Sequence, residues 1–71
     1  MKTEIELYKV VAILKDMTEK KIKKGQVGTV VEKLDEDVYE IEFCDKSGQT
    51  VLTTSIHSEY LLVLDFDLVA A

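Results

Sequence analysis

The chain has 71 residues, of which 46% are hydrophobic and 32% charged, and its formal net charge is −5. This length suffices for one compact core with no room for a second, and the apolar content excludes an intrinsically disordered chain. The chain has 14 acidic residues against 9 lysines and contains no arginine. Binding to nucleic acid is therefore disfavoured, because a net negative charge repels phosphates and the bidentate guanidinium group is missing.

Cysteine content and the first residues indicate the compartment. Cys44 is the only cysteine, so no disulfide forms within the chain, and a reducing compartment is expected. Residues 1–7 alternate charged and apolar side chains, unlike a signal peptide, and no segment approaches the ~20 apolar residues that cross a bilayer. We therefore expect a cytoplasmic protein that does not contact a membrane.

The first half of the chain predicts two strands separated by a long loop. Residues 7–14 form a short apolar run that is rich in Val and Ile, which favours a strand over a helix. Residues 15–24 are polar and rich in lysine and predict a loop that Ile22 anchors on the core. A second strand is expected over residues 25–32, in which the two glycines either take positive φ or permit a bulge.

The second half predicts three short strands separated by tight turns. Residues 38–43 alternate clearly, which places Tyr39, Ile41 and Phe43 on one face of a strand. Gly48 is expected to supply the left-handed position of a hairpin turn. The other elements expected here are a turn at 35–37, a strand at 49–56, a single 3₁₀ turn at 57–60 and a last strand at 61–64.

The strand assignments also predict which side chains are buried. Cys44, at the end of a strand, is expected to be a small buried side chain, and His57 is expected to be a surface or capping residue. Ten side chains are predicted to face inward: Val10, Ala12, Ile22, Val27, Val30, Tyr39, Ile41, Phe43, Val51 and Leu61.

This order of elements predicts an all-β, five-stranded SH3-like barrel over residues 1–64, followed by a tail at 65–71. The segment KGQVGTVVE, followed by VYEIEF, resembles the pattern of SH3-like barrels of the KOW type. Most of the chain is similar to a family of small bacterial proteins known only as a domain of unknown function. The resemblance implies a fold and no catalytic residue, and it suggests an accessory or antitoxin-like role.

The composition offers few groups for catalysis or metal binding. A pair of Cys44 and His57 is the only thiol and imidazole combination in the chain, and structural roles are favoured for both. One cysteine and one histidine do not make a zinc site, and the acidic turn at 35–37 lacks the spaced oxygen ligands of a calcium loop. We therefore expect no enzymatic activity, no metal and no cofactor.

The expected function is a non-enzymatic protein-interaction module with an unidentified protein partner. The tail alternates acidic and apolar residues, which suits packing on its own barrel, on a second subunit in a homo-oligomer, or on a partner. The candidate partner-binding residues are Tyr8, Tyr60, Phe66 and Leu68. The alternative is a KOW-like module that binds RNA or the ribosome, in which Lys20, Lys21, Lys23 and Lys24 contact phosphates.

Overall fold

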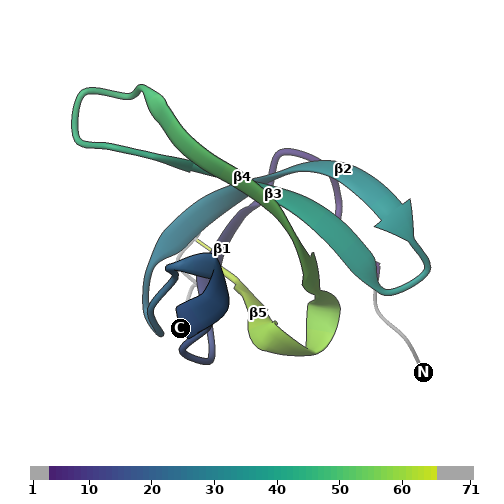
Figure 1. Cartoon of the computed structure of the whole chain (residues 1–71). Coiled ribbons are helices and arrows are strands. Elements are labelled where there is room, and N and C mark those ends of the chain that lie inside the picture. Colours follow the sequence, from purple (N-terminus) through teal and green to yellow (C-terminus); the bar gives the residue numbers. More distant parts are fainter. Residues whose placement is uncertain (1–3, 66–71) are drawn as a thin grey trace, which may run out of the picture.

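The computed structural model describes residues 4–65, which form one antiparallel sheet (Figure 1). Its elements are β1 (Val10–Ile13), η1 (Thr18–Lys20), β2 (Val27–Asp35), β3 (Val38–Cys44), β4 (Thr50–His57), η2 (Ser58–Tyr60) and β5 (Leu61–Val63), where η denotes a 3₁₀ turn. The strand order is β4-β3-β2-β1-β5. These observations confirm the all-β class, the five strands, the long first loop and the 3₁₀ turn before the last strand.

The sheet is strongly twisted and does not close into a barrel within the described residues. The pairing of β2 with β3 shifts register between Val30 and Glu32 and again between Lys33 and Asp35. Such irregularities bend a strand and increase its twist. Figure 1 shows β3 and β4 as long twisted ribbons above β1 and β5. Since β4 and β5 are the two edges of the sheet, the closed barrel expected from the sequence is an open, coiled sheet instead.

The core lies inside this coil and draws residues from all five strands and the first loop. Its buried side chains are Val11, Ile13, Met17, Ile22, Val30, Tyr39, Ile41, Phe43, Ile56 and Leu61. The hydroxyl group of Tyr39 accepts a hydrogen bond of 3.1 Å from the backbone nitrogen of Ile5, which satisfies its polar atom within the core. Within the described part of the chain, no helix has the length and apolar character that crossing a membrane requires.

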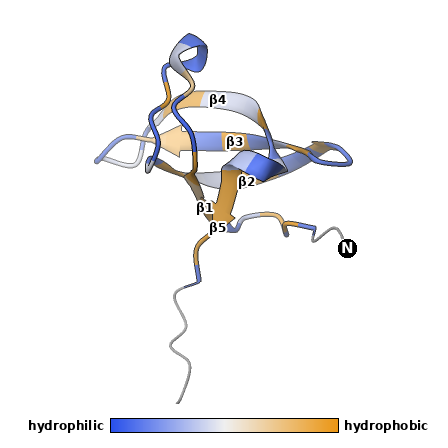
Figure 2. Cartoon of the chain, turned by 90° about the horizontal axis from the view of Figure 1, so that it is seen from below, coloured by the Kyte–Doolittle hydropathy of each residue, from blue (hydrophilic) through white to orange (hydrophobic). Residues whose placement is uncertain are grey.

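Six of the ten side chains predicted to face inward are buried, and the predictions for Val10, Ala12, Val27 and Val51 were wrong. On β1 the buried residues are Val11 and Ile13, whereas Val10 and Ala12 are half-buried. Figure 2 shows β1 coloured almost entirely as hydrophobic. Because four apolar residues follow one another there, alternation cannot indicate which pair faces the core. Val27 and Val51 are 50% and 63% exposed.

Gly48 has the left-handed conformation predicted for it, Gly25 takes positive φ, which was one of its two expected alternatives, and Gly28 has a different role. Gly25 and Gly48 have φ of +92° and +88°. A Cβ atom at Gly28 would lie 2.6 Å from Cγ2 of Ile41 and 3.0 Å from Cδ1 of Phe43. The absence of a side chain at Gly28 therefore lets β3 pack these two core residues against β2.

The loop at residues 14–26 folds back on itself and onto the sheet. The backbone of Met17 and Ile22 exchanges two hydrogen bonds, of 2.8 Å and 3.1 Å, around η1. The side chain of Ile22 is 2% exposed, which confirms it as the anchor of the loop. Nζ of Lys20 donates a hydrogen bond of 3.2 Å to Oγ1 of Thr54 on β4. The loop is thus held over the inner face of β3 and β4.

Candidate functional site

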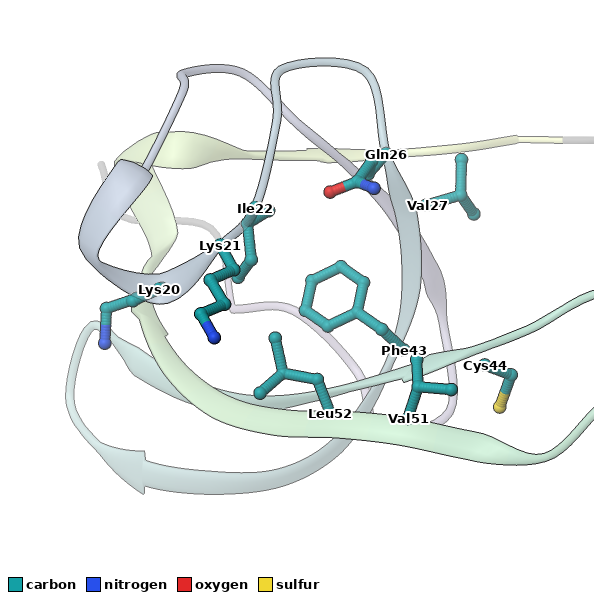
Figure 3. Close-up of a pocket in the computed structure, with 9 residues that line it drawn as sticks. All are labelled: Lys20, Lys21, Ile22, Gln26, Val27, Phe43, Cys44, Val51 and Leu52. Atoms are coloured by element: carbon teal, nitrogen blue, oxygen red, sulfur yellow. The ribbon is translucent and has the colours of Figure 1, made fainter.

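Two pockets lie between this loop and β4. The first, termed the Phe43 pocket, has a volume of about 420 Å³ and is shown in Figure 3. The second, termed the Tyr60 pocket, has a volume of about 270 Å³ and extends towards η2. Lys20 lines both pockets. The two pockets therefore follow each other along β4, on either side of the contact between Lys20 and Thr54.

The Phe43 pocket has an apolar lining. Phe43 is 6% exposed, and in Figure 3 its ring projects from β3 towards the segment that carries Lys21 and Ile22. Leu52 on β4 lies beside this ring, and the pairing of Phe43 with Leu52 puts both on the inner face of the sheet. The exposed side chains of Val27 and Val51 complete the apolar lining. Val27 and Val51 thus add exposed apolar surface next to a largely buried aromatic ring.

Two lysines give the same pocket a positive charge. Lys21 follows η1 in the left-handed conformation, with φ of +60°, and its side chain lines the pocket. No carboxylate of residues 4–65 forms an ion pair with Lys20 or Lys21. Lys20 donates to the neutral hydroxyl group of Thr54 rather than to a carboxylate. The pocket therefore combines apolar walls with two ammonium groups.

The Tyr60 pocket has a mixed lining. Nζ of Lys15 lies 5.1 Å from the centroid of the Tyr60 ring, a cation–π geometry. The ring of His57 meets that of Tyr60 edge-on at 6.4 Å. Asp16 and Glu19 also line this pocket, so its charges are of both signs. The sequence prediction included Tyr60 as a binding residue and missed Lys15, which only the tertiary contact places beside the ring.

The structure does not bring Cys44 and His57 together. His57 pairs with Val38 at one end of the β3–β4 ladder, and Cys44 pairs with Thr50 at the other. Nδ1 of His57 accepts a hydrogen bond of 3.1 Å from the backbone nitrogen of Glu59, which confirms its capping role at η2. The expected burial of Cys44 was wrong, because the strand extends past the core there, and its thiol is exposed beside the Phe43 pocket.

The aromatic residues proposed for one binding patch are separate. Tyr8 is 73% exposed, and its backbone nitrogen bonds the carbonyl oxygen of Val30 just before β1. The carbonyl oxygen of Tyr60 accepts from the backbone nitrogen of Leu14 just after β1. Tyr8 and Tyr60 thus lie at opposite ends of this strand. The other two candidates, Phe66 and Leu68, lie outside the described residues.

The four lysines proposed for nucleic acid all lie on the loop between β1 and β2. Side-chain acceptors hold the backbone there: Oε1 of Gln26 accepts from the nitrogen of Lys23 at 2.7 Å, and Oδ1 of Asp16 accepts from that of Lys24 at 2.8 Å. Among residues 4–65, no group of three or more His, Cys, Asp or Glu side chains is arranged to hold a metal ion. The loop thus presents ammonium groups on an ordered backbone.

Comparison with known proteins identifies the family. Residues 7–63 match the family described as Domain of unknown function (DUF4926). The chain belongs to this family. The segment that matches DUF4926 includes every residue that lines the Phe43 and Tyr60 pockets. No curated protein and no solved structure matches the chain.

Sequence reasoning missed the Phe43 pocket as a site. Val27 and Val51 were assigned to the core because each lies in an apolar strand, and no local signal distinguishes an exposed valine from a buried one. Lys20 and Lys21 were recognised, but as contacts to phosphate. Their position beside exposed apolar side chains depends on how the loop folds over β4, which spacing along the chain does not reveal.

Proposed function

We propose that this member of the DUF4926 family is a non-enzymatic protein-binding module that holds an extended segment of its partner between the β1–β2 loop and β4. The observation that carries this proposal is the Phe43 pocket, in which exposed apolar side chains and two lysines without a carboxylate partner among residues 4–65 line one volume of about 420 Å³. A segment with an apolar side chain next to an acidic one complements both properties.

The apolar lining supplies affinity. Val27 and Val51 are both more than one third exposed, so a bound side chain would remove their apolar surface from water. Removing apolar surface from water is favourable by roughly 25 cal/mol per Å² before the costs of association are counted. Phe43 is already part of the core, so the floor of the pocket needs no rearrangement before a segment binds, which limits the cost of association.

The lysines supply selectivity. The whole chain is acidic, and its formal net charge of −5 repels acidic partners at long range. At the Phe43 pocket the local charge is positive, because Lys20 and Lys21 line it without carboxylate partners among the described residues. An acidic residue next to the apolar anchor is therefore favoured over a basic one, and added salt weakens this preference.

The test is a titration of the full chain, labelled with ¹⁵N, with two matched sets of short peptides. One set carries Phe or Leu flanked by Asp, and the other carries the same apolar residue flanked by Lys. We expect the acidic set to shift the amide resonances of Lys21, Phe43 and Leu52, and Val51→Asp to abolish these shifts. Equal shifts with the basic set, or no shifts with either set, would overturn the proposal.

The second candidate is RNA binding through the loop, and one observation favours it. Lys21, Lys23 and Lys24 have no ion-pair partner among residues 4–65, so three ammonium groups of one loop are available to phosphates. Together with Lys20 they concentrate positive charge within residues 20–24 of the loop. The test changes all four lysines to Gln and measures RNA affinity at low and moderate salt. The variant should bind RNA much more weakly than the native chain, and its affinity should depend less on salt. If the variant binds RNA as tightly as the native chain, or if the native chain does not bind RNA, this candidate is ruled out.

A further inference from the structure

We infer that the segment bound in the Phe43 pocket is residues 65–71 of a second copy of this chain, so that the protein associates with itself through this pocket. The inference rests on the proposed function, because it names the partner of the same site. Its basis is a match between the chemistry of the pocket and a segment that lies almost entirely outside the described residues.

The segment has the composition that the pocket selects. It reads DFDLVAA and begins with two acidic residues on either side of Phe66, followed by Leu68. An aromatic ring at Phe66 suits a lining of Phe43, Leu52 and exposed valines. The carboxylate of Asp67, next to Phe66, suits the ammonium groups of Lys20 and Lys21. The first peptide set of the preceding section has this same pattern of an apolar residue between two aspartates.

The topology shows why the bound segment belongs to a second copy. Val27 of the pocket pairs with Ala12, which pairs with Leu62 on β5, so two strand spacings of about 4.8 Å separate Val27 from β5. Leu64 bonds the carbonyl oxygen of Val10, two residues or about 7 Å beyond this row. The chain therefore leaves β5 while moving away from the pocket.

Few residues separate the end of β5 from Phe66. Consecutive Cα atoms are about 3.8 Å apart, and Phe66 follows Leu64 by only two residues, whereas a chain reversal takes about four. We therefore assign the bound segment to a second copy rather than to the same chain. Each copy has one pocket, partly lined by the edge strand β4, and one segment that follows the other edge strand β5 in the sequence, so two copies either exchange segments reciprocally or form a head-to-tail chain.

The test uses three variants of the full chain and sedimentation velocity over a range of concentrations. Val51→Asp alters the pocket, and the double substitution Phe66→Ser and Leu68→Ser alters the segment. Leu34→Asp is the matched control, because Leu34 is an exposed apolar residue that does not line the pocket and its substitution changes the net charge equally. We expect the native chain and the control to associate as concentration rises. The pocket variant and the segment variant should each remain monomeric while retaining a native circular dichroism spectrum.

The decisive step is a mixture of the two defective variants. The pocket variant still has an intact segment, and the segment variant still has an intact pocket, so the mixture should form a single one-to-one complex. A native chain that stays monomeric into the millimolar range, or a mixture that forms no complex, overturns the inference. If the acidic peptides still bind the native chain in that case, the proposed function stands and its partner is another protein.

Discussion

Nζ of Lys20 lies 3.2 Å from Oγ1 of Thr54, to which it donates a hydrogen bond across 34 positions of sequence. Lys20 ends η1 on the first loop, and Thr54 faces inward on β4, opposite Ile41. Because Lys20 lines both pockets, this contact divides the space between the loop and the strand into two volumes. This bond links the loop to β4 in addition to the anchoring of the loop by the buried side chain of Ile22.

Thr54→Val tests the tie between the loop and β4, because it removes the acceptor and preserves the shape of the side chain. The variant should lose about 1 kcal/mol or less in its free energy of unfolding, since the bond is only partly buried. The backbone nitrogens of Lys20 and Lys21 each donate a 3.0 Å hydrogen bond within η1, and their amide hydrogens should exchange faster. Thr53→Val on the exposed face is the control, and unchanged exchange in Thr54→Val would show that the loop is held by other contacts.

Ile13→Ala and Leu14→Ala test which residues of the first strand face the core. Ile13 is fully buried, so its truncation should cost about 2–5 kcal/mol in the free energy of unfolding. The neighbouring Leu14 is largely exposed, and its truncation should cost less than about 1 kcal/mol. Urea denaturation of both variants measures the difference. If Leu14→Ala proved the more damaging of the two, the inward face of β1 would be the opposite one.

Gly28→Ala tests the close packing of β2 on β3. The added methyl group would lie 2.6 Å from Cγ2 of Ile41 and 3.0 Å from the carbonyl oxygen of Glu42, and the backbone atom cannot move aside. We expect a loss of about 1–3 kcal/mol in the free energy of unfolding. The ring of Phe43 is also within 3.0 Å, so the affinity for acidic peptides should change as well. A variant with native stability and native affinity would contradict the packing described here.

Asp45 makes the β3–β4 hairpin sensitive to acid. Its Oδ1 atom accepts from the hydroxyl group of Ser47 at 2.7 Å, and from the backbone nitrogens of Ser47 at 2.9 Å and Gln49 at 3.0 Å. The hydrogen bond from the Ser47 hydroxyl group, followed by that from the Gln49 backbone, lowers the pKa of Asp45 below its ordinary value. Since the folded-state pKa is the lower one, this contribution is complete above the unfolded pKa of about 4 and is lost as pH falls through the folded pKa.

Asp45→Asn provides the measurement, because the two proteins differ only in this one carboxylate. The native chain should have the higher melting temperature at neutral pH, and the difference between the two proteins should shrink once the pH falls below about 4. Thermal melts followed by circular dichroism between neutral and strongly acidic pH give this comparison. A difference that stays constant over the whole range would show that the carboxylate is not the group responsible.

The sequence by itself determined those features that depend on neighbouring residues. The alternation at residues 38–43 placed Tyr39, Ile41 and Phe43 on the inner face of β3, because a strand with one buried face has a period of two. Gly48 marked the hairpin turn, because few other residues adopt positive φ without strain. His57 caps η2 as expected, because the imidazole nitrogen that accepts the hydrogen bond is only two residues from the backbone nitrogen of Glu59 that donates it.

The tertiary structure alone decided the features that join distant segments. Val10 and Val11 are equally apolar, and only the position of β1 between β2 and β5 selects Val11 for the core. The Phe43 pocket takes its lining from a loop and three strands, so the meeting of its apolar walls with Lys20 and Lys21 is not visible as a local pattern. Lys20 reaches Thr54 because the loop folds back over β4, and such a contact follows from the packing of the whole chain rather than from the residues on either side of it.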